Sequence, residues 1–146
     1  MKPHIRRFQK KDAEEVSSLI WQTIFTVNIK DYSHDHLETI AAMYTPEKLA
    51  KNSQEKKIFI AELAERIVGT ATIHNDYISC VFVLHNYIGK GIGKLLMETV
   101  ENDARQRKER SVHLDSSTTA QTFYELLGYQ IDVVKPGTIA MHKDLI

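Results

Sequence analysis

Cysteine is almost missing from this chain, which also lacks an excess of charge of either sign and any long hydrophobic run. The single cysteine, Cys80, excludes an internal disulfide framework and any zinc or iron–sulfur site built from several cysteines. Nineteen Lys and Arg residues balance nineteen Asp and Glu residues, so no overall field attracts nucleic acid or an anionic membrane. No segment approaches the ~18 apolar residues that a membrane span requires, and the N-terminus has no apolar core of signal-peptide length. We therefore expect a cytoplasmic protein with no metal, no nucleic-acid partner and no membrane partner.

The composition is typical of one soluble globular domain. The chain has 146 residues, of which 42% are hydrophobic and 26% are charged, and a chain of this size can bury a sizeable core. No repeat, low-complexity segment or linker divides it. We expect a single domain over residues 1–146, present as a monomer or a homodimer.

Hydrophobic periodicity predicts a strand and helices in the first third of the chain. Residues 4–8 are typical of a short strand, and Asp12 with Glu15 has the spacing of a capping box at a helix start. Apolar residues then recur at helical spacing to residue 43, with an interruption at the segment DYSHDH. A further short helix is predicted to open at Thr45-Pro46-Glu47, because proline is well tolerated in the first turn.

From residue 57 onward the pattern changes to strands. The segments KIFIAEL, RIVGTATIH and YISCVFVL predict an antiparallel meander with turns at Ala64-Glu65 and Asn75-Asp76. An apolar stripe then predicts a helix from about residue 91 to 107. The segment SVHLDSS predicts a strand, TTAQTFYELL a helix ended by Gly128, and YQIDVVK and TIAMHKDL two closing strands around Pro136-Gly137. This pattern indicates a mixed α/β sheet.

Three of the six glycines lie within five residues of one another, at Gly89, Gly91 and Gly93. Glycine loses more backbone entropy on folding than other residues, so the cluster opposes stability unless the backbone must approach a partner closely. It stands between a predicted strand and a predicted helix, where unpaired N–H groups and the positive end of the helix dipole coincide. Such a site suits an anion, and Lys90 and Lys94 add charge at its rim. We expect a diphosphate ligand.

Two common nucleotide-binding motifs do not fit this cluster. The ATP-binding pattern GxxxxGK[ST] needs a glycine and a hydroxyl where this chain has Ile88 and Leu95. The dinucleotide pattern GxGxxG belongs to an early parallel βαβ unit, whereas this chain has GxGxG after an antiparallel meander. Both ATP and NAD are therefore disfavoured.

Two separated segments resemble the signatures of the GCN5-related N-acetyltransferase family. In ISCVFVLHNYIGKGIGKLLMETVENDA, residues 78–104, the stretch from Ile88 to Gly93 is similar to the family's Q/RxxGxG/A acetyl-CoA loop. The segment SSTTAQTFYELLGY, residues 116–129, is similar to the family's second signature, roughly AxxFYxxxGF. The matching residues of that segment are Ala120, Phe123, Tyr124, Gly128 and Tyr129. The resemblance implies a mostly antiparallel sheet of about seven strands with a splayed parallel pair, flanked by about four helices.

The resemblance also implies an activity, namely transfer of the acetyl group of acetyl-CoA to a primary amine of a small molecule or peptide by direct attack. It implies that Tyr124 protonates the departing coenzyme A thiolate, because a positioned phenol is a serviceable acid for a thiolate. In the family, pantetheine pairs with the exposed backbone of the strand before the glycine loop. The coenzyme-binding residues expected here are Phe82, Val83, Ile88, Gly89, Lys90, Gly91, Ile92, Gly93, Lys94 and Ser117.

Two departures from the family pattern bear on function. Ile88 occupies the usual Gln or Arg position, and since that position contributes mainly through its main chain, we expect a working loop. The strand YISCVFVL has no acidic residue, although some family members place a general base there. The base is thus unidentified, and an acyl-CoA-binding sensor with little catalysis remains the alternative function.

Candidate acceptor contacts lie in two connections. Tyr32 and His34, with the neighbouring Asp31, stand between the first helices, and His74 and Tyr77 flank the turn at Asn75-Asp76. They are candidate base or substrate contacts, although a solvated loop and ordinary turn chemistry explain the same residues. The histidines of the first connection lack third and fourth ligands nearby, so we expect no metal site there.

Four further side chains have structural explanations. Trp21, Phe25 and Phe59 are expected in the core, although the first two are alternatively expected to line an apolar acceptor pocket. Cys80 with His85 as its base would suit an acyl-enzyme mechanism. Direct transfer needs no acyl-enzyme, however, and a buried thiol on a strand is more often a small hydrophobe.

Overall fold

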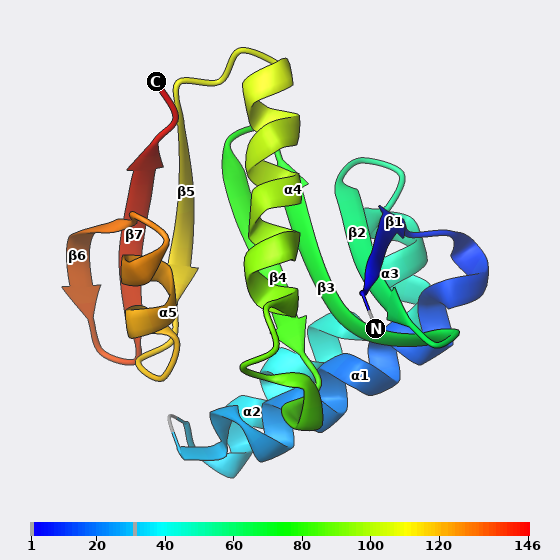
Figure 1. Cartoon of the computed structure of the whole chain (residues 1–146). Helices are drawn as coiled ribbons and strands as arrows, with labels where there is room; N and C mark the ends of the chain where they lie inside the picture. Colours follow the sequence, from blue (N-terminus) through cyan, green and yellow to red (C-terminus); the bar gives the residue numbers. More distant parts are fainter. Residues whose placement is uncertain (1, 31) are drawn as a thin grey trace.

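The computed structural model describes residues 2–30 and 32–146 and arranges them around one seven-stranded sheet (Figure 1). The strands are β1 His4–Arg7, β2 Lys57–Leu63, β3 Arg66–His74, β4 Tyr77–Val83, β5 Ser111–Ser116, β6 Gln130–Lys135 and β7 Thr138–Asp144. The α-helices are α1 Ala13–Thr26, α2 His34–Ala41, α3 Pro46–Asn52, α4 Ile92–Gln106 and α5 Gln121–Leu126. The mixed α/β fold is confirmed, with five α-helices where about four were expected.

The sheet order is β1-β2-β3-β4-β5-β7-β6, and every neighbouring pair is antiparallel except β4 with β5. The parallel pair is joined at one position, Tyr77 opposite His113. The His113 N–H adds one bond of 2.8 Å to the carbonyl of Asp76. Beyond that point the two strands separate, as Figure 1 shows. The predicted splayed parallel pair is therefore present, and it leaves one edge of β4 open.

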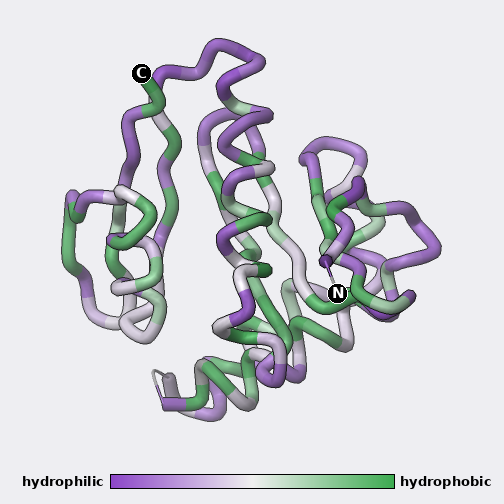
Figure 2. The backbone as a smooth tube through the Cα atoms, in the orientation of Figure 1, coloured by the Kyte–Doolittle hydropathy of each residue, from purple (hydrophilic) through white to green (hydrophobic). Residues whose placement is uncertain are grey.

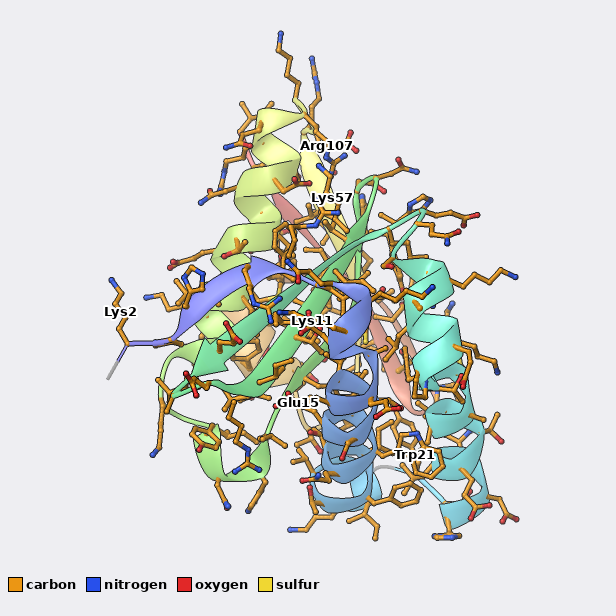
Figure 3. All side chains as sticks on the ribbon, turned by 90° about the vertical axis from the view of Figure 1, so that its right-hand side faces the viewer. Lys2, Lys11, Glu15, Trp21, Lys57 and Arg107 are labelled. Carbon is orange, nitrogen blue, oxygen red and sulfur yellow. The ribbon has the colours of Figure 1, made fainter. Side chains whose placement is uncertain are left out.

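Helices cover both faces of the sheet. Figure 3 shows α4 on one side of the strands and α1, α2 and α3 on the other. The apolar stripe of α4 is buried at Leu96, Met97 and Val100, and α1 buries Ile20 and Ile24 in the same way. The link between α4 and β5 is hydrophilic, whereas β3 and β4 are largely hydrophobic (Figure 2). The core therefore lies between the middle strands and these helices.

Local sequence signals predicted several element ends correctly. The expected helix near residues 91–107 spans Ile92–Gln106, and Gly128 follows α5 with a φ of +100°. Gly137 forms the turn between β6 and β7 with a φ of +76°. Glycine adopts these angles without steric cost, which explains why it marks both positions.

The predicted capping box at the start of α1 is wrong. Asp12 does occupy the position before the helix, but its carboxylate accepts hydrogen bonds from the Gln9 N–H at 2.7 Å and from Arg6 at 2.9 Å. Glu15 instead accepts a 2.8 Å bond from the N–H of Ile67 on β3. Asp12 is thus engaged by residues that precede it, and Glu15 by a residue on a distant strand, in place of the bond that the spacing favours.

Trp21 is not a core residue, and neither Trp21 nor Phe25 lines the cavity described below. The indole is 42% exposed, and its position is labelled in Figure 3. Its ring packs against Phe25 at 5.9 Å between centroids, and Phe25 in turn contacts His34 at 5.6 Å. Phe25 and Phe59 are partly buried against the core. Helical spacing alone does not reveal that the side of α1 that carries Trp21 faces solvent.

No helix among the described residues is both long and apolar enough to traverse a lipid bilayer.

Candidate active site

The glycine cluster connects β4 to α4, and its glycines serve two different purposes. Gly89 and Gly91 have φ angles of +84° and +83°, and a Cβ at either position would meet no atom within 4 Å. Their backbone conformation is therefore what requires glycine. Gly93 is different, because a Cβ there would lie 3.0 Å from the ring of Phe123 on α5. The third glycine lets α4 pack closely against α5.

The backbone of this loop offers unpaired donors. Leu95 is the first α4 residue whose N–H reaches a backbone carbonyl, that of Gly91, at 3.1 Å. Among the described residues, the N–H groups of residues 89–94 donate no hydrogen bond. They coincide with the positive end of the α4 dipole, so the loop has the donor set that a phosphate group needs. Lys94, in the first turn of α4, adds a positive charge.

The open edge of β4 leads away from this loop. A register shift opposite β3 places Cys80 and Val81 together across from Ala71, and Cys80 has a φ of +55°. This bulge bends β4 away from β5 and increases its twist. Phe82 and Val83 pair with Thr70 and Gly69 of β3 on one side. Their other edge has no strand partner among the described residues, so extended polar groups of a ligand can pair with it.

A cavity of about 620 Å³ follows that edge. Gly89, Gly91 and Gly93 lie on its wall together with Phe82, Val83 and Ser117. Residues from α1 and α2 also line it, although those helices cover the opposite face of the sheet from α4 (Figure 3). The gap between β4 and β5 therefore makes one cavity that both faces of the sheet can reach.

Tyr124 lines this cavity from α5. The side chain is 6% exposed, and its ring packs edge-on against Phe123 at 5.0 Å and Tyr129 at 5.7 Å between centroids. No hydrogen bond from its hydroxyl is found within residues 2–30 and 32–146. Burial, with a smaller effect of Tyr77, raises the pKa of Tyr124 well above the ordinary value. The phenol is therefore neutral and able to donate a proton or a hydrogen bond.

Tyr77 and Asp115 meet where β4 and β5 separate. The Tyr77 hydroxyl donates a 2.7 Å hydrogen bond to Asp115 Oδ2, and both residues line the cavity. Burial, then this bond, raises the pKa of Tyr77 to about 12. Sequence reasoning identified Tyr77 but missed Asp115, because only the parallel pairing of β4 with β5 brings the two strands together.

The remaining expected contacts divide between those at the cavity and those away from it. Tyr32 lines the cavity and donates a 2.7 Å hydrogen bond to the carbonyl of Gly137. Ile88 also lines it. Ile92 is buried in the core, and the ammonium group of Lys90 lies over the Tyr87 ring, 5.7 Å from its centroid. Neither of these two side chains lines the cavity.

The two expected histidine contacts are not at the cavity. His34 has a side chain that is 69% exposed and lies 3.1 Å from Glu38 on the surface of α2. His74 ends β3 in an exposed position. Asp31 lies outside the described residues. The structure does not bring these histidines together with Tyr124.

Cys80 is on the cavity wall but is not activated. Burial raises the pKa of its thiol to about 12, even though Thr72 and Lys56 act in the opposite direction. His85, which would be the base of an acyl-enzyme mechanism, is exposed, and no contact between the two is found among the described residues. A neutral thiol is a poor nucleophile.

Within the described ranges no group of three His, Cys, Asp or Glu side chains could hold a metal ion.

Comparison with known proteins agrees with this geometry. Residues 28–137 match the family model described as "Acetyltransferase (GNAT) domain". The chain is 24% identical over 129 residues to the uncharacterized N-acetyltransferase YafP of Escherichia coli (strain K12), a match covering 86% of this chain and 80% of that protein.

Solved structures have the same fold. The GCN5-related N-acetyltransferase from Rhodopseudomonas palustris superimposes with a TM-score of 0.92 at 24% identity, over 99% of this chain and 96% of that one. The PaiA N-acetyltransferase from Thermoplasma acidophilum, solved in complex with coenzyme A, gives a TM-score of 0.90 at 20% identity, with 99% of both chains covered. The family match extends over most of the chain and includes the glycine loop and Tyr124. The chain therefore belongs to the GCN5-related N-acetyltransferase (GNAT) family and is an acyltransferase of that family.

Proposed function

We propose that this protein transfers the acetyl group of acetyl-CoA to a primary amine of a small molecule or peptide. The observation that carries the proposal is the continuous cavity that joins the glycine loop, the open edge of β4 and the Tyr124 hydroxyl. A nucleotide diphosphate, an extended amide-bearing arm and a thioester are joined in this order in acetyl-CoA. The cavity thus has a matching group for each part of that molecule.

Each part of the coenzyme would be held by groups already in place. The free N–H groups of residues 89–94 would bind the pyrophosphate, with Lys94 nearby. The backbone of Phe82 and Val83 would pair with the pantetheine amides, because this edge of β4 lacks a strand partner. Ser117, whose Oγ accepts a 3.2 Å bond from the Ala120 N–H, would border the coenzyme between β5 and α5.

The acetyl transfer would depend on two groups of the cavity wall, one that donates a hydrogen bond and one that donates a proton. Acetyl-CoA supplies the acetyl group when the amine attacks its thioester carbonyl and the C–S bond breaks. A backbone N–H on the open β4 edge would stabilise the negative charge that develops on the carbonyl oxygen. Tyr124 would donate its phenolic proton to the departing sulfur, since burial keeps the phenol neutral. The attacking nitrogen would release a proton to water, and the Tyr124 phenolate would take one up again. The protonated, cavity-facing thiol of Cys80 favours direct attack over an acyl-enzyme.

An assay of thiol release with a panel of amines and acetyl-CoA tests the proposal. We expect saturable release of coenzyme A that depends on the amine. Tight coenzyme binding without acetylation of any amine would contradict it and would favour an acyl-CoA sensor. A failure of both binding and release would contradict both functions.

A further inference from the structure

Charge is scarce on the cavity wall. Among the lining residues in the described part of the chain, only Lys94 and Asp115 carry a full charge. Lys94 stands beside the glycine loop, whereas Asp115 lies two residues beyond the single point where β5 pairs with β4. A β-strand advances about 3.3 Å per residue, so β4 separates the two charges by on the order of 15 Å. Asp115 is thus remote from the expected phosphate site and is available to a second ligand.

The Asp115 carboxylate has only part of its bonding capacity in use. Oδ2 accepts the 2.7 Å bond from the Tyr77 hydroxyl. Asp115 forms no ion pair with any lysine, arginine or histidine within residues 2–30 and 32–146. His113, two residues earlier on β5, lies 3.7 Å from Asp76 instead. Oδ1 can therefore accept bonds from a cationic ligand at no cost to an existing ion pair.

The helical wall of the cavity is uncharged and largely apolar. Its side chains come from α1, α2 and the turn that follows, and include Ile24, Val27, Leu37, Ile40 and Tyr44. Ile24 and Leu37 are almost completely buried. Burial raises the pKa of Tyr44 well above its ordinary value, so this phenol is neutral as well. A ligand on this side meets hydrocarbon and aromatic surface.

We propose that the acetyl acceptor is a primary amine with one positive charge on an apolar aliphatic or aromatic body, and that its ammonium group binds to Asp115. This inference rests on the proposed function and narrows it to a class of substrate. The apolar body would lie against the α1 and α2 wall. Tyr77 would hold the carboxylate in the orientation that its 2.7 Å bond defines. Asp115 would bind the ammonium group and then take up one of its protons, because only the neutral amine can attack the thioester carbonyl. The carboxylate is exposed, so it can pass that proton to solvent.

The same wall disfavours two other classes of amine. A diamine would place its second ammonium group among Ile24, Leu37 and Ile40, where the described residues offer no counter-charge. An amino acid would bring a carboxylate near Asp115 with no cation to compensate it. Burying an unpaired charge is unfavourable, and like charges at close range repel each other. Both classes should therefore be poor acceptors.

Two matched pairs of amines test this specificity on the wild-type protein. We expect kcat/KM for hexylamine to exceed that for 1,6-diaminohexane at least tenfold, and the same preference for 2-phenylethylamine over phenylalanine. Equal or greater activity on the diamine or the amino acid would overturn the inference while the proposed function stood. Coenzyme binding without acetylation of either monoamine would also overturn it. Loss of coenzyme binding itself would contradict the proposed function.

Asp115→Asn tests the assigned residue. Asparagine keeps an oxygen that can accept the Tyr77 bond, removes the negative charge and replaces the second acceptor oxygen by an NH2 donor. We expect KM for hexylamine to rise at least tenfold and kcat to fall, since asparagine cannot take up the proton, with the coenzyme A dissociation constant unchanged. The matched control is Asp132→Asn, an exposed carboxylate on β6 that bonds to His142 at 2.6 Å and does not line the cavity. The control should behave like wild type, and an unchanged KM in Asp115→Asn would refute the assignment.

Discussion

Two neighbouring buried tyrosines differ in what their hydroxyl groups contact. Tyr129 donates a 2.8 Å hydrogen bond to Glu101, whereas Tyr124 faces the cavity and has no such bond within the described ranges. Their rings pack against each other at 5.7 Å between centroids. One hydroxyl therefore has a structural partner, and the other is available for the acid role that we propose.

Replacing Tyr124 by phenylalanine should separate catalysis from binding. Positioned acids contribute on the order of 100-fold or more to turnover, so we expect kcat to fall by about that factor in Tyr124→Phe while the coenzyme A dissociation constant stays constant. Steady-state kinetics and calorimetry measure the two quantities. Unchanged kcat would remove the acid role.

Tyr129→Phe is the matched control for that substitution. It removes the hydrogen-bond donor from the buried Glu101 carboxylate, which should lower the free energy of unfolding by roughly 1–3 kcal/mol. Turnover of the folded protein should stay close to that of wild type. Chemical denaturation and kinetics on the same sample would establish the contrast between the two hydroxyls.

At the scale of elements, the loop between β4 and α4 depends on two kinds of glycine. Position 91 requires glycine because its φ is +83°. An alanine held in this left-handed conformation costs about 1–2 kcal/mol of conformational free energy. We expect Gly91→Ala to turn the loop N–H groups away from their common point and to weaken coenzyme A binding at least tenfold by calorimetry. Binding of wild-type affinity would show that the loop backbone does not hold the coenzyme.

Gly93→Ala should act through packing. Its Cβ would approach the Phe123 ring to 3.0 Å, and overpacking of this kind costs about 1–3 kcal/mol. We expect a lower melting temperature, with recovery in the double variant Gly93→Ala, Phe123→Leu, which has a smaller side chain at the contact. Failure of the double variant to recover would indicate a different role for this glycine.

Elements with local signals were predictable from the sequence, and long-range contacts were not. Both ends of α4, the C-terminal end of α5 and the turn at Gly137 follow from periodicity and from glycine, which act over a few residues, whereas α5 begins at Gln121 and not at the expected Thr118. The bond from Ile67 to Glu15 joins residues far apart in sequence, so a local capping rule could not predict it. The same reason explains why Asp115 was missed, since its partner Tyr77 stands on another strand.

At the scale of the whole molecule, Glu101 joins the two halves that flank the cavity. β4 and β5 share one paired position, so α4 must help to hold β5, β7 and β6 in place. Glu101 on α4 is buried and accepts bonds of 2.8 Å from Lys143 on β7 and from Tyr129. None of these three residues lines the cavity, so the contacts join α4 to β7 and Tyr129 beside it.

Glu101→Ala should therefore lower both stability and coenzyme affinity. Lys143 is partly exposed and can be rehydrated, so we expect a loss of only about 2 kcal/mol in the free energy of unfolding. Coenzyme A affinity should fall because the two cavity walls lose their connection. Asp103→Ala is the control, since Asp103 forms ion pairs with Lys57 on β2 and with Arg107, the residue that follows α4, and with no residue of β7 among the described residues. Lys57 and Arg107 are labelled in Figure 3. An equal loss of affinity in both variants would argue against this role.

Tyrosines with raised pKa values should make the protein sensitive to alkali. Burial raises the pKa of Tyr44, Tyr77, Tyr124 and Tyr129, in the case of Tyr77 to about 12. An unfolded tyrosine ionises near pH 10, so above that pH the unfolded chain releases protons first and stability falls. We expect the melting temperature to drop steeply from about pH 10 to 12, and less steeply in Tyr44→Phe. If the melting temperature fell equally steeply with pH in wild type and Tyr44→Phe, the raised pKa of Tyr44 would be contradicted.

The backbone amides between β4 and α4 are central to the proposed function. Titration of ¹⁵N-labelled protein with coenzyme A, followed by amide NMR, reports on those groups directly. We expect the largest shifts at residues 89–94, with further shifts at Phe82 and Val83. Saturable binding that leaves those amides unmoved, or no binding at all, would contradict the account.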